Sequence, residues 1–366
     1  MSFCPYFDTG QCRSCSWIDY FYGEQLKQKE AHLHSLLDPS DPLQWLKPVS
    51  SPLKGFRNKA KMVAIPAPEG IVLGLSDEIS LIDCPLYDTA MQRTLHTVEE
   101  WLRELGIKAY DVKKKKGELK YVLLTRSVAD GSMMLRFVLR SHGIISRLRG
   151  GLETLMARAA DLKVVTANIQ SVHMAILEGE EEIFLTQEER LEERFNAIPL
   201  YIRPKSFFQT NPAVAEKLYR TAAEWVGESA PKRVWDLFCG VGGFALHCAA
   251  PGREIVGIEI EPEAIACARD SARSLGLENV RFESLDSASF MAAGGDKPDV
   301  VVVNPPRRGL GEQLCKWLER AAPERIVYSS CNAPSLAKGL QQLPGYRLWR
   351  VQLFDMFPPT PPYETV

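Results

Sequence analysis

The sequence predicts an α/β protein in which a Rossmann-like C-terminal half follows a mainly antiparallel central region. From about Phe195 onward, strand-like and helix-like segments alternate, which is typical of a mostly parallel sheet of the seven-stranded type. A glycine-rich turn near Gly240 joins one of these strands to a helix. In the middle of the chain, a turn at residues 129–131 separates two apolar strand-like segments, which indicates a hairpin.

Length and composition suggest a chain of several parts without a membrane span. The 366 residues exceed one ordinary core, so we expect an N-terminal cysteine segment with a helix (1–37), a central domain (38–194) and a C-terminal domain (195–366). No apolar run approaches the roughly 18 residues of a membrane helix. The start lacks the regions of a signal peptide. We therefore expect a cytoplasmic protein, and by default a monomer.

Cysteines near the N-terminus predict a metal site. Cys4, Cys12 and Cys15 lie in a turn-rich segment, and Cys84 is the next cysteine along the chain. Four thiolates fit either structural zinc or an iron–sulfur cluster, and the spacing does not decide between them. Unrelated surface cysteines explain the clustering less well. Four other cysteines lie in or beside apolar segments and are predicted to be small buried hydrophobic residues: Cys239, Cys248, Cys267 and Cys315.

The next segments predict a helix, then a basic strand. Residues 17–37 have the apolar spacing of an amphipathic helix. Residues 55–61 carry three cations and an aromatic side chain and lead into a strand at 62–65. Lysines on an edge strand discourage aggregation, and they also bind phosphate. Taken alone, this segment is better explained as a solvated edge strand.

The central region is predicted to be mostly antiparallel sheet. Residues 121–126 and 133–140 form the expected hairpin. Further strands are expected at 164–170, at 173–177 and at 182–185. The net charge of −2 does not by itself indicate a nucleic-acid-binding protein.

A basic run precedes this hairpin. It is either a solvated face or, with nearby arginines, a positive face for phosphate contact. The cations concerned are Lys113, Lys114, Lys115, Lys116, Lys120, Arg126, Arg136 and Arg140.

The C-terminal half begins with a predicted nucleotide-type site. A helix at about 213–225 precedes residues 233–244, which are predicted to form a strand, a glycine-rich turn and the start of a helix. The next strand, 254–259, ends in Glu259, with a helix at 262–275 behind it. Glycines let the backbone approach a ligand at a helix start, and an acid about 20 residues on accepts hydrogen bonds from a ribose diol.

Two further strands place polar residues at one edge of the sheet. The β-branched run at 299–303 stops at Asn304, the first residue of an Asn-Pro-Pro motif. After a helical stretch at 314–318, the strand at 325–328 leads to Cys331. Ligands bind beyond the carboxyl ends of such strands, so Asn304 and Cys331 are expected to face one crevice. The combined motifs indicate an S-adenosylmethionine site in an enzyme that works through Cys331.

These motifs together resemble the RNA (uracil-5-)-methyltransferase family over essentially the whole chain. The resemblance rests on the N-terminal cysteines, Ser-Phe-Phe-Gln-Thr-Asn at 206–211, Asp-Leu-Phe-Cys-Gly-Val-Gly-Gly at 236–243, Asn-Pro-Pro-Arg-Arg-Gly at 304–309 and Ser-Ser-Cys-Asn at 329–332. A glutamate near the end of the chain, Glu364, also matches. The sequence is most similar to the small bacterial members that act on 23S ribosomal RNA, which begin at the cluster cysteines.

The resemblance implies an S-adenosylmethionine-dependent methyltransferase domain and specific roles for individual residues. It implies Cys331 as nucleophile and Glu364 as general base. The implied ligands of a [4Fe–4S] cluster are Cys4, Cys12, Cys15 and Cys84. The implied contacts of S-adenosylmethionine are Gln209, Phe238, Glu259 and Asn304. The implied substrate is a single-stranded or loop region of 23S rRNA, gripped through Lys59, Lys61, the 113–116 lysines and nearby arginines.

The sequence departs from the family pattern in three places. Asn304 replaces a common aspartate and Ala333 a common proline, and both replacements occur in the 23S rRNA subgroup. At the end, residues 357–364 are proline-rich where the family has histidines near Phe357 and before the final glutamate. We therefore expect the usual closing strand, which would hold Glu364, to be absent.

The mechanistic hypothesis is addition of the Cys331 thiolate to carbon 6 of a uracil, which makes carbon 5 nucleophilic toward the methyl group. Glu364 would then remove the carbon 5 proton so that the cysteine is expelled. Two alternatives remain open. One is a methyltransferase of exocyclic or side-chain amino groups that uses Asn-Pro-Pro without a thiol. The other is a non-catalytic RNA-binding module with a vestigial cofactor site.

Overall fold

The computed structural model describes residues 2–37, 43–68, 70–75, 79–172, 177–286 and 297–366. The chain forms two compact units. The first unit comprises Met1–Cys12 and Lys54–Glu193, and the second comprises Arg13–Leu53 and Arg194–Val366. The predicted N-terminal segment thus contributes residues to both units. The three predicted domain ranges themselves stay predictions.

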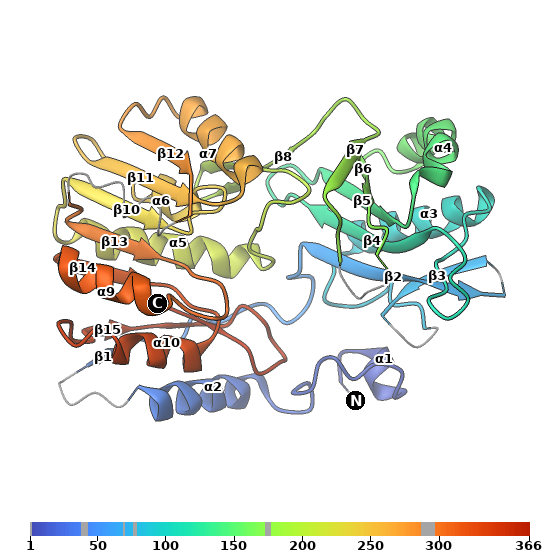
Figure 1. The fold of residues 1–366 in the computed structure, drawn as a ribbon. Coiled ribbons are helices and arrows are strands. Elements are labelled where there is room, and N and C mark those ends of the chain that lie inside the picture. Colours follow the sequence, from blue (N-terminus) through green and yellow to red (C-terminus); the bar gives the residue numbers. More distant parts are fainter. Residues whose placement is uncertain (1, 38–42, 69, 76–78, 173–176, 287–296) are drawn as a thin grey trace. The chain divides into compact units, whose positions relative to one another are not determined.

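The first unit is built on a six-stranded sheet (Figure 1). Its strand order is β3-β2-β4-β5-β6-β7, and every neighbouring pair is antiparallel except β5 and β6. The predicted hairpin is confirmed, because β4 pairs antiparallel with β5. The strand predicted at 173–177 falls almost entirely outside the described residues. The strands are β2 (Lys59–Ala67), β3 (Gly70–Gly74), β4 (Leu119–Arg126), β5 (Met133–Leu139), β6 (Leu162–Ile169) and β7 (Glu181–Phe184).

Two helices that the sequence analysis did not predict complete the core of the first unit. α3 (Thr89–Glu104) begins at Asp88, whose carboxylate accepts a hydrogen bond from the Met91 N–H at 2.8 Å. α4 (Ile145–Arg158) forms the crossover between the parallel strands β5 and β6. The Trp101 indole of α3 donates to the Gly151 carbonyl of α4 at 2.9 Å. Both helices pack on one face of the sheet in a single apolar cluster, next to the short helix η1 (His142–Ile144).

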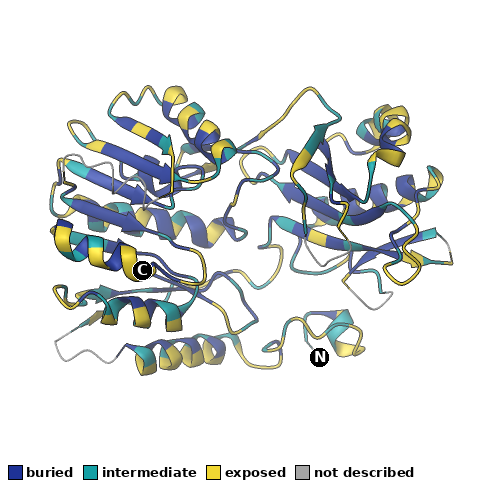
Figure 2. Cartoon of the chain, viewed as in Figure 1, coloured by how far each residue is buried: buried dark blue, intermediate teal, exposed yellow. Residues whose placement is uncertain are grey.

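The second unit is built on five parallel strands in the order β12-β11-β10-β13-β14. The order reverses beside β10, and such a reversal opens a ligand crevice at the carboxyl edge. Every residue of Val300–Val303 is buried, which explains why a continuous β-branched run occupies the middle of the sheet (Figure 2). The strands are β10 (Arg233–Leu237), β11 (Glu254–Glu259), β12 (Val280–Ser284), β13 (Val300–Val303) and β14 (Arg325–Tyr328).

Helices cover both faces of this sheet, as predicted for alternating strands and helices. Trp235 and Leu237 of β10 share an apolar cluster with residues of α9 and α10. Between them, Asp236 points to the opposite face and accepts a hydrogen bond from Ala245 in α6. The helices are α5 (Pro212–Gly227), α6 (Gly243–His247), α7 (Pro262–Ser274), α9 (Glu312–Ala321) and α10 (Ala333–Gln341). A small pair, β8 (Leu191–Phe195) and β9 (Ile198–Ile202), precedes α5.

A closing strand is present, so the expectation that it is missing was wrong. β17 (Glu364–Thr365) pairs antiparallel with β16 (Leu353–Phe354). Thr365 also exchanges two backbone hydrogen bonds with Ser330, at 2.8 and 2.9 Å, just beyond β14. This bridge therefore links the two-stranded sheet of β16 and β17 to the end of β14 in the five-stranded sheet. The prolines between residues 357 and 363 lie in the connecting loop, where no ladder N–H is required.

Residues Arg13–Leu53, which precede most of the first unit in the sequence, belong to the second unit. α2 (Tyr22–Leu36) packs beside α10 (Figure 1), and it begins five residues later than the predicted helix. β1 (Gln44–Trp45) pairs parallel with β15 (Arg350–Val351). Leu33 and Tyr363 share one apolar cluster. α2 and the C-terminal segment are thus packed together, although they are far apart in sequence.

Candidate active site

The glycine-rich turn after β10 adopts the strained backbone that a close ligand approach requires. Phe238 has a φ of 68°, and Gly242 has a φ of 86° directly before α6. A side chain at position 242 would also meet the Phe282 ring at 2.9 Å, so only glycine fits there. The turn exposes backbone N–H groups at the start of α6.

Two carboxyl groups lie against this turn. Glu259 ends β11 and accepts hydrogen bonds from the backbone N–H groups of Gly240 at 3.2 Å and Ile260 at 2.7 Å. Asp236 is fully buried, and burial raises its pKa to about 7 despite the Ala245 N–H. Sequence reasoning singled out Glu259 but not Asp236, which was hidden inside a strand.

Gln209 and Asn304 occupy two other segments of the second unit. Gln209 is buried just before α5. Its segment is tethered by Asn211, whose amide donates to the Ser51 hydroxyl at 2.7 Å and the Met356 carbonyl at 3.2 Å. Asn304 follows β13, is half-buried, and donates its backbone N–H to the Leu237 carbonyl at 3.4 Å. Asn304 therefore lies directly beside the end of β10.

A hydrogen bond from Asn332 connects the loop after β14 to the loop after β13. The Asn332 side chain donates to the Arg307 carbonyl at 3.1 Å and caps α10 by accepting from the Ser335 N–H at 3.3 Å. Cys331 is half-buried between these contacts. Burial and the nearby Glu364 raise the pKa of its thiol, whereas Arg307 lowers it. Arg307 is thus the group that favours the thiolate form.

Glu364 is held on β17 in an environment suited to proton transfer. Its side chain is buried, and Oε1 accepts a hydrogen bond from the Ser329 hydroxyl at 2.6 Å. Burial raises the pKa of Glu364 to about 7. A carboxyl group of that pKa exchanges protons near neutral pH. Because β17 fixes it beside the segment that leads to Cys331, the two groups can serve one reaction.

The cysteines predicted as metal ligands are divided between the two units. Cys4, Cys12 and Cys84 belong to the first unit, and Cys15 to the second. Burial raises the pKa of the Cys84 thiol to about 11, and its electrostatic interaction with Cys4 and Cys12 adds to this increase. Over the described ranges, no group of three or more histidine, cysteine or carboxylate side chains has the arrangement of a single-ion site.

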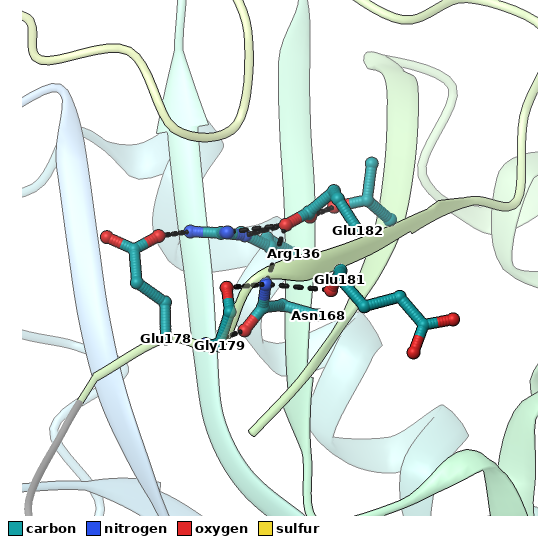
Figure 3. Close-up of polar contacts among 7 residues, drawn as sticks. Arg136, Asn168, Glu178, Gly179, Glu181 and Glu182 are labelled. Carbon is teal, nitrogen blue, oxygen red and sulfur yellow. Dashed lines mark hydrogen bonds and ion pairs between the residues drawn. The ribbon is translucent and has the colours of Figure 1, made fainter. Parts of the chain in front are cut away.

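Most arginines of the predicted positive face are engaged by carboxylates. Arg136 is buried and contacts Glu178 and Glu182, while Asn168 also donates to Glu182 at 2.9 Å (Figure 3). Arg126 and Arg140 form ion pairs as well, with Asp88 at 3.0 Å and with Glu118 at 2.6 Å.

The lysines of the predicted face differ among themselves. Lys113 to Lys116 are exposed, as is Lys61, which lies 5.5 Å from the centre of the Tyr121 ring. Lys59 is less accessible, and burial lowers its pKa. Lys120 is buried and donates to the carbonyls of Gln170 and Val172. The exposed positive charge of the first unit is therefore carried mainly by lysines.

Comparison with known proteins identifies the family. Residues 153–366 match the family model described as tRNA (Uracil-5-)-methyltransferase. Over 367 aligned residues, the chain is 53% identical to the 23S rRNA (uracil(747)-C(5))-methyltransferase RlmC of Escherichia coli, covering 99% of this chain and 98% of that protein. The chain belongs to the tRNA (uracil-5-)-methyltransferase family. The relative of the same description from Shigella flexneri is likewise 53% identical, with the same coverage.

A solved structure supports membership of the tRNA (uracil-5-)-methyltransferase family. The Pyrococcus abyssi tRNA (uracil-54, C5)-methyltransferase in complex with S-adenosyl-L-homocysteine superimposes with a TM-score of 0.80 and 27% identity, over 96% of this chain and 84% of that one. The predicted fold class is thereby confirmed. The family match includes every predicted cofactor and catalytic position from Gln209 to Glu364, but not the four cluster cysteines.

Two further observations bear on sequence predictions. The four cysteines expected in the core are buried, as predicted: Cys239, Cys248, Cys267 and Cys315. Within the described ranges, none of the helices is both long and apolar enough to cross a lipid bilayer.

Proposed function

We propose that this chain transfers a methyl group from S-adenosyl-L-methionine to carbon 5 of a uridine in 23S rRNA, in the cytoplasm. The target corresponds to uridine 747, which the curated relatives modify according to their names. The observation that carries the proposal is the pairing of β17 with Ser330, because it places the buried Glu364 carboxyl next to the Cys331 loop. A thiol and a proton-exchanging carboxyl are the two groups that this reaction needs.

The methyl donor would occupy the crevice at the carboxyl edge of the second unit. We assign the ribose to Glu259, which ends β11 beside the glycine-rich turn. Phe238, Asn304 and Gln209 would contact the rest of the molecule. The donor set fits a nucleoside, because it combines a carboxylate, side-chain amides and an aromatic ring. When bound, the donor supplies an electrophilic methyl group.

The chain's own residues would carry the remaining steps. The Cys331 thiolate, favoured by Arg307, adds to carbon 6 of the uracil, and carbon 5 becomes an enolate carbon. Carbon 5 would then form its bond to the methyl group while the bond between that methyl and the donor's sulfur breaks, and the donor would leave as S-adenosyl-L-homocysteine. Glu364 takes the carbon 5 proton, the carbon–sulfur bond breaks, and the thiolate leaves. Ser329 orients the carboxyl group for this transfer through its hydrogen bond.

We also propose that Cys4, Cys12, Cys15 and Cys84 hold a [4Fe–4S] cluster. The fit rests on a donor set of thiols and on the electrostatic interaction of Cys84 with Cys4 and Cys12. In such a cluster each thiolate binds a different iron, so the sulfurs are farther apart than around one zinc ion. Iron and sulfide analysis of anaerobically purified chain tests the assignment, and Cys84→Ala should lose both. Zinc in place of iron would contradict it.

The RNA substrate would present the target base unpaired. A base inside a duplex cannot reach a side chain on a loop, so the uridine must be unstacked. Single-stranded loops make that step least costly. Among the exposed lysines of the first unit, Lys61 and Lys113 to Lys116 are the proposed phosphate contacts. We propose that the chain acts as a monomer.

The decisive experiment uses methyl-labelled S-adenosylmethionine and 23S rRNA that lacks the modification. After digestion, label in 5-methyluridine at position 747 is expected. Label in another nucleoside would favour the alternative that methylates amino groups through Asn-Pro-Pro. Absence of both label and cofactor binding would favour a non-catalytic RNA-binding module.

A further inference from the structure

A cavity of about 440 Å³ lies beside Cys331 in the second unit. Its lining comes from the α2 region, from the loops after β13 and β14, and from the segment before β17. The side chains that matter for its chemistry are Trp17, His32, Arg307, Cys331, Pro362 and Tyr363. Most of the exposed surface of the lining is apolar, and polar side chains occur among the apolar and aromatic ones, as in sites for flat organic ligands.

Trp17 is fixed in this cavity by its backbone and its neighbours. The backbone N–H of Trp17 donates to the Pro359 carbonyl at 3.0 Å, and its backbone carbonyl accepts from the Gln25 side-chain amide at 3.0 Å. The Tyr20 ring stands nearly perpendicular to the indole at 6.4 Å between centres. The hydrogen bonds fix the Trp17 backbone and the Tyr20 ring limits the motion of the indole, so a ligand that stacks on the indole costs the protein little conformational freedom.

His32 and Tyr363 form a polar pair in the same lining. The Tyr363 hydroxyl and His32 Nδ1 are 2.8 Å apart, and the two rings meet edge to face. A neutral imidazole has two ring nitrogens that can each make one hydrogen bond. With Nδ1 engaged by the tyrosine, Nε2 is the nitrogen available to the edge of a base.

The charges around the cavity favour RNA. Lys29 also lines it, but its ammonium is paired with Asp355 at 2.6 Å and both side chains are fully buried. Arg307 is exposed and lies at the Cys331 end. A guanidinium on an open rim suits a phosphate group. The cavity thus combines stacking surfaces with one accessible cation.

We infer that this cavity binds the nucleotide next to the target uridine, stacked on Trp17 and hydrogen-bonded by His32, while the target base lies at the Cys331 end. The inference rests on the proposed function and deepens it. The cavity is larger than one pyrimidine ring requires. Neither Phe238 nor Glu259, the proposed donor contacts, is among its lining residues. A nucleotide continuous with the target is therefore the occupant that fits its place and chemistry.

The test measures RNA binding by the full chain, with methylation of the same RNAs as a second readout. The probes are stem-loops that carry uridine 747 in the loop, either intact or with an abasic site on the 5′ or the 3′ side. Wild type is compared with Trp17→Ala, Trp17→Phe and His32→Ala. His34→Ala is the matched control, because His34 is an exposed histidine of α2 that stacks on Trp45 at 3.5 Å. Melting curves establish that each variant is folded.

For wild type, one of the two abasic RNAs should bind ~10-fold more weakly than the intact RNA. Trp17→Ala should bind the intact RNA ~10-fold more weakly and show no further loss with that abasic RNA, because both changes remove the same stack. His32→Ala should bind the intact RNA more weakly than wild type. Trp17→Phe should restore most of the binding, and His34→Ala should match wild type. In turnover, Trp17→Ala should raise KM and leave kcat nearly unchanged.

The inference would be overturned if the losses of RNA affinity from Trp17→Ala and from the abasic site were additive. It would also be overturned if wild type bound both abasic RNAs as tightly as the intact RNA. The two readouts separate the two proposals. If the chain methylates the RNA but the losses from Trp17→Ala and from the abasic site are additive, the inference is contradicted and the proposed function is not. Coupled binding without any 5-methyluridine would support the inference as a binding site and contradict the proposed function.

Discussion

Two buried glutamates, one in each unit, have opposite surroundings. Glu182 in the first unit receives hydrogen bonds from Arg136, from Thr166 at 2.7 Å and from Asn168 at 2.9 Å. Glu364 in the second unit is equally buried, but its partner is the neutral hydroxyl of Ser329. Burial beside neutral groups raises the pKa of Glu364 into the neutral range.

The comparison suggests that Glu182 serves structure in the first unit and Glu364 serves chemistry in the second. Arg136 and its acidic partners fix the strands β5, β6 and β7 to one another (Figure 3). In the second unit, both Asp236 and Glu364 have a pKa near 7 because of burial. Clusters of such groups at the end of a sheet are typical of active sites.

The largest expected effect is on Cys331→Ala. Removal of the proposed nucleophile should lower the methylation rate by ~10⁴-fold or more, because carbon 5 of uracil reacts poorly without the adduct. Cys315→Ala, which changes a buried cysteine of α9, is the control and should keep its activity. RNA that contains 5-fluorouracil should trap a covalent complex with wild type and not with Cys331→Ala. Full turnover by Cys331→Ala would sink the mechanism.

Glu364→Gln should lower turnover by ~10³-fold, within the range for loss of a general base. The amide keeps the size of the carboxyl group and still accepts from Ser329, so the fold should hold. Because the adduct forms but its proton is not removed, covalent protein–RNA complex should accumulate on denaturing gels with ordinary uridine. A normal rate without accumulation would show that another group removes the proton.

Arg136→Met should destabilise the first unit by about 3 kcal/mol, because it leaves Glu182 buried without its cation. Chemical denaturation measures the effect. Lys163→Met is the control, since that cation forms an exposed pair with Asp130 and should cost less than about 1 kcal/mol. An unchanged unfolding free energy for Arg136→Met would contradict the structural role assigned to the network.

The methylation rate should rise steeply with pH below 7, because Glu364 acts in its ionised form, and should rise further above pH 7 as the Cys331 thiol, whose pKa is raised, becomes a thiolate. The stability should change in the opposite direction. Its carboxyl group binds protons more tightly when folded than when unfolded, so stability falls as pH rises from about 5 to 7. Glu364→Gln should remove this contribution from both profiles. Melting temperatures across the pH range check the second part.

The smallest expected effect is on Lys61→Ala. Loss of one phosphate contact should weaken RNA binding several-fold and reduce the slope of log affinity against log salt by about 1. The matched variant is Lys120→Met, whose ammonium is already engaged by two carbonyls, and the salt slope should stay unchanged there. Equal slopes for wild type and Lys61→Ala would remove Lys61 from the interface.

The sequence was most informative where local pattern determines structure. Val300–Val303 was predicted as a strand because an apolar β-branched run suits a doubly covered sheet position. The polar motifs after such strands then had to lie at one edge. The missed helix α3 also carried a local signal, since Met91, Leu95 and Val98 have helical spacing and Asp88 caps its start.

The remaining features depend on contacts between distant residues. β17 has only two residues and no periodicity, and it forms because it pairs with β16 and because Thr365 bridges to Ser330. Arg136 and Glu182 form an ion pair although they are 46 positions apart in sequence. Arg136, which the sequence placed in a possible positive face for RNA, is therefore buried. No local pattern reveals such pairings, because side-chain partners are set by tertiary packing.

The buried ion pair between Lys29 and Asp355 has a consequence for how the molecule is assembled. The two residues are 326 positions apart, so α2 leaves the ribosome long before the residues that receive it. An ammonium group cannot be buried without its counter-ion, so α2 stays undocked until synthesis has passed Asp355. Fragments from interrupted synthesis that lack Asp355 therefore display an undocked helix, which proteases can cleave.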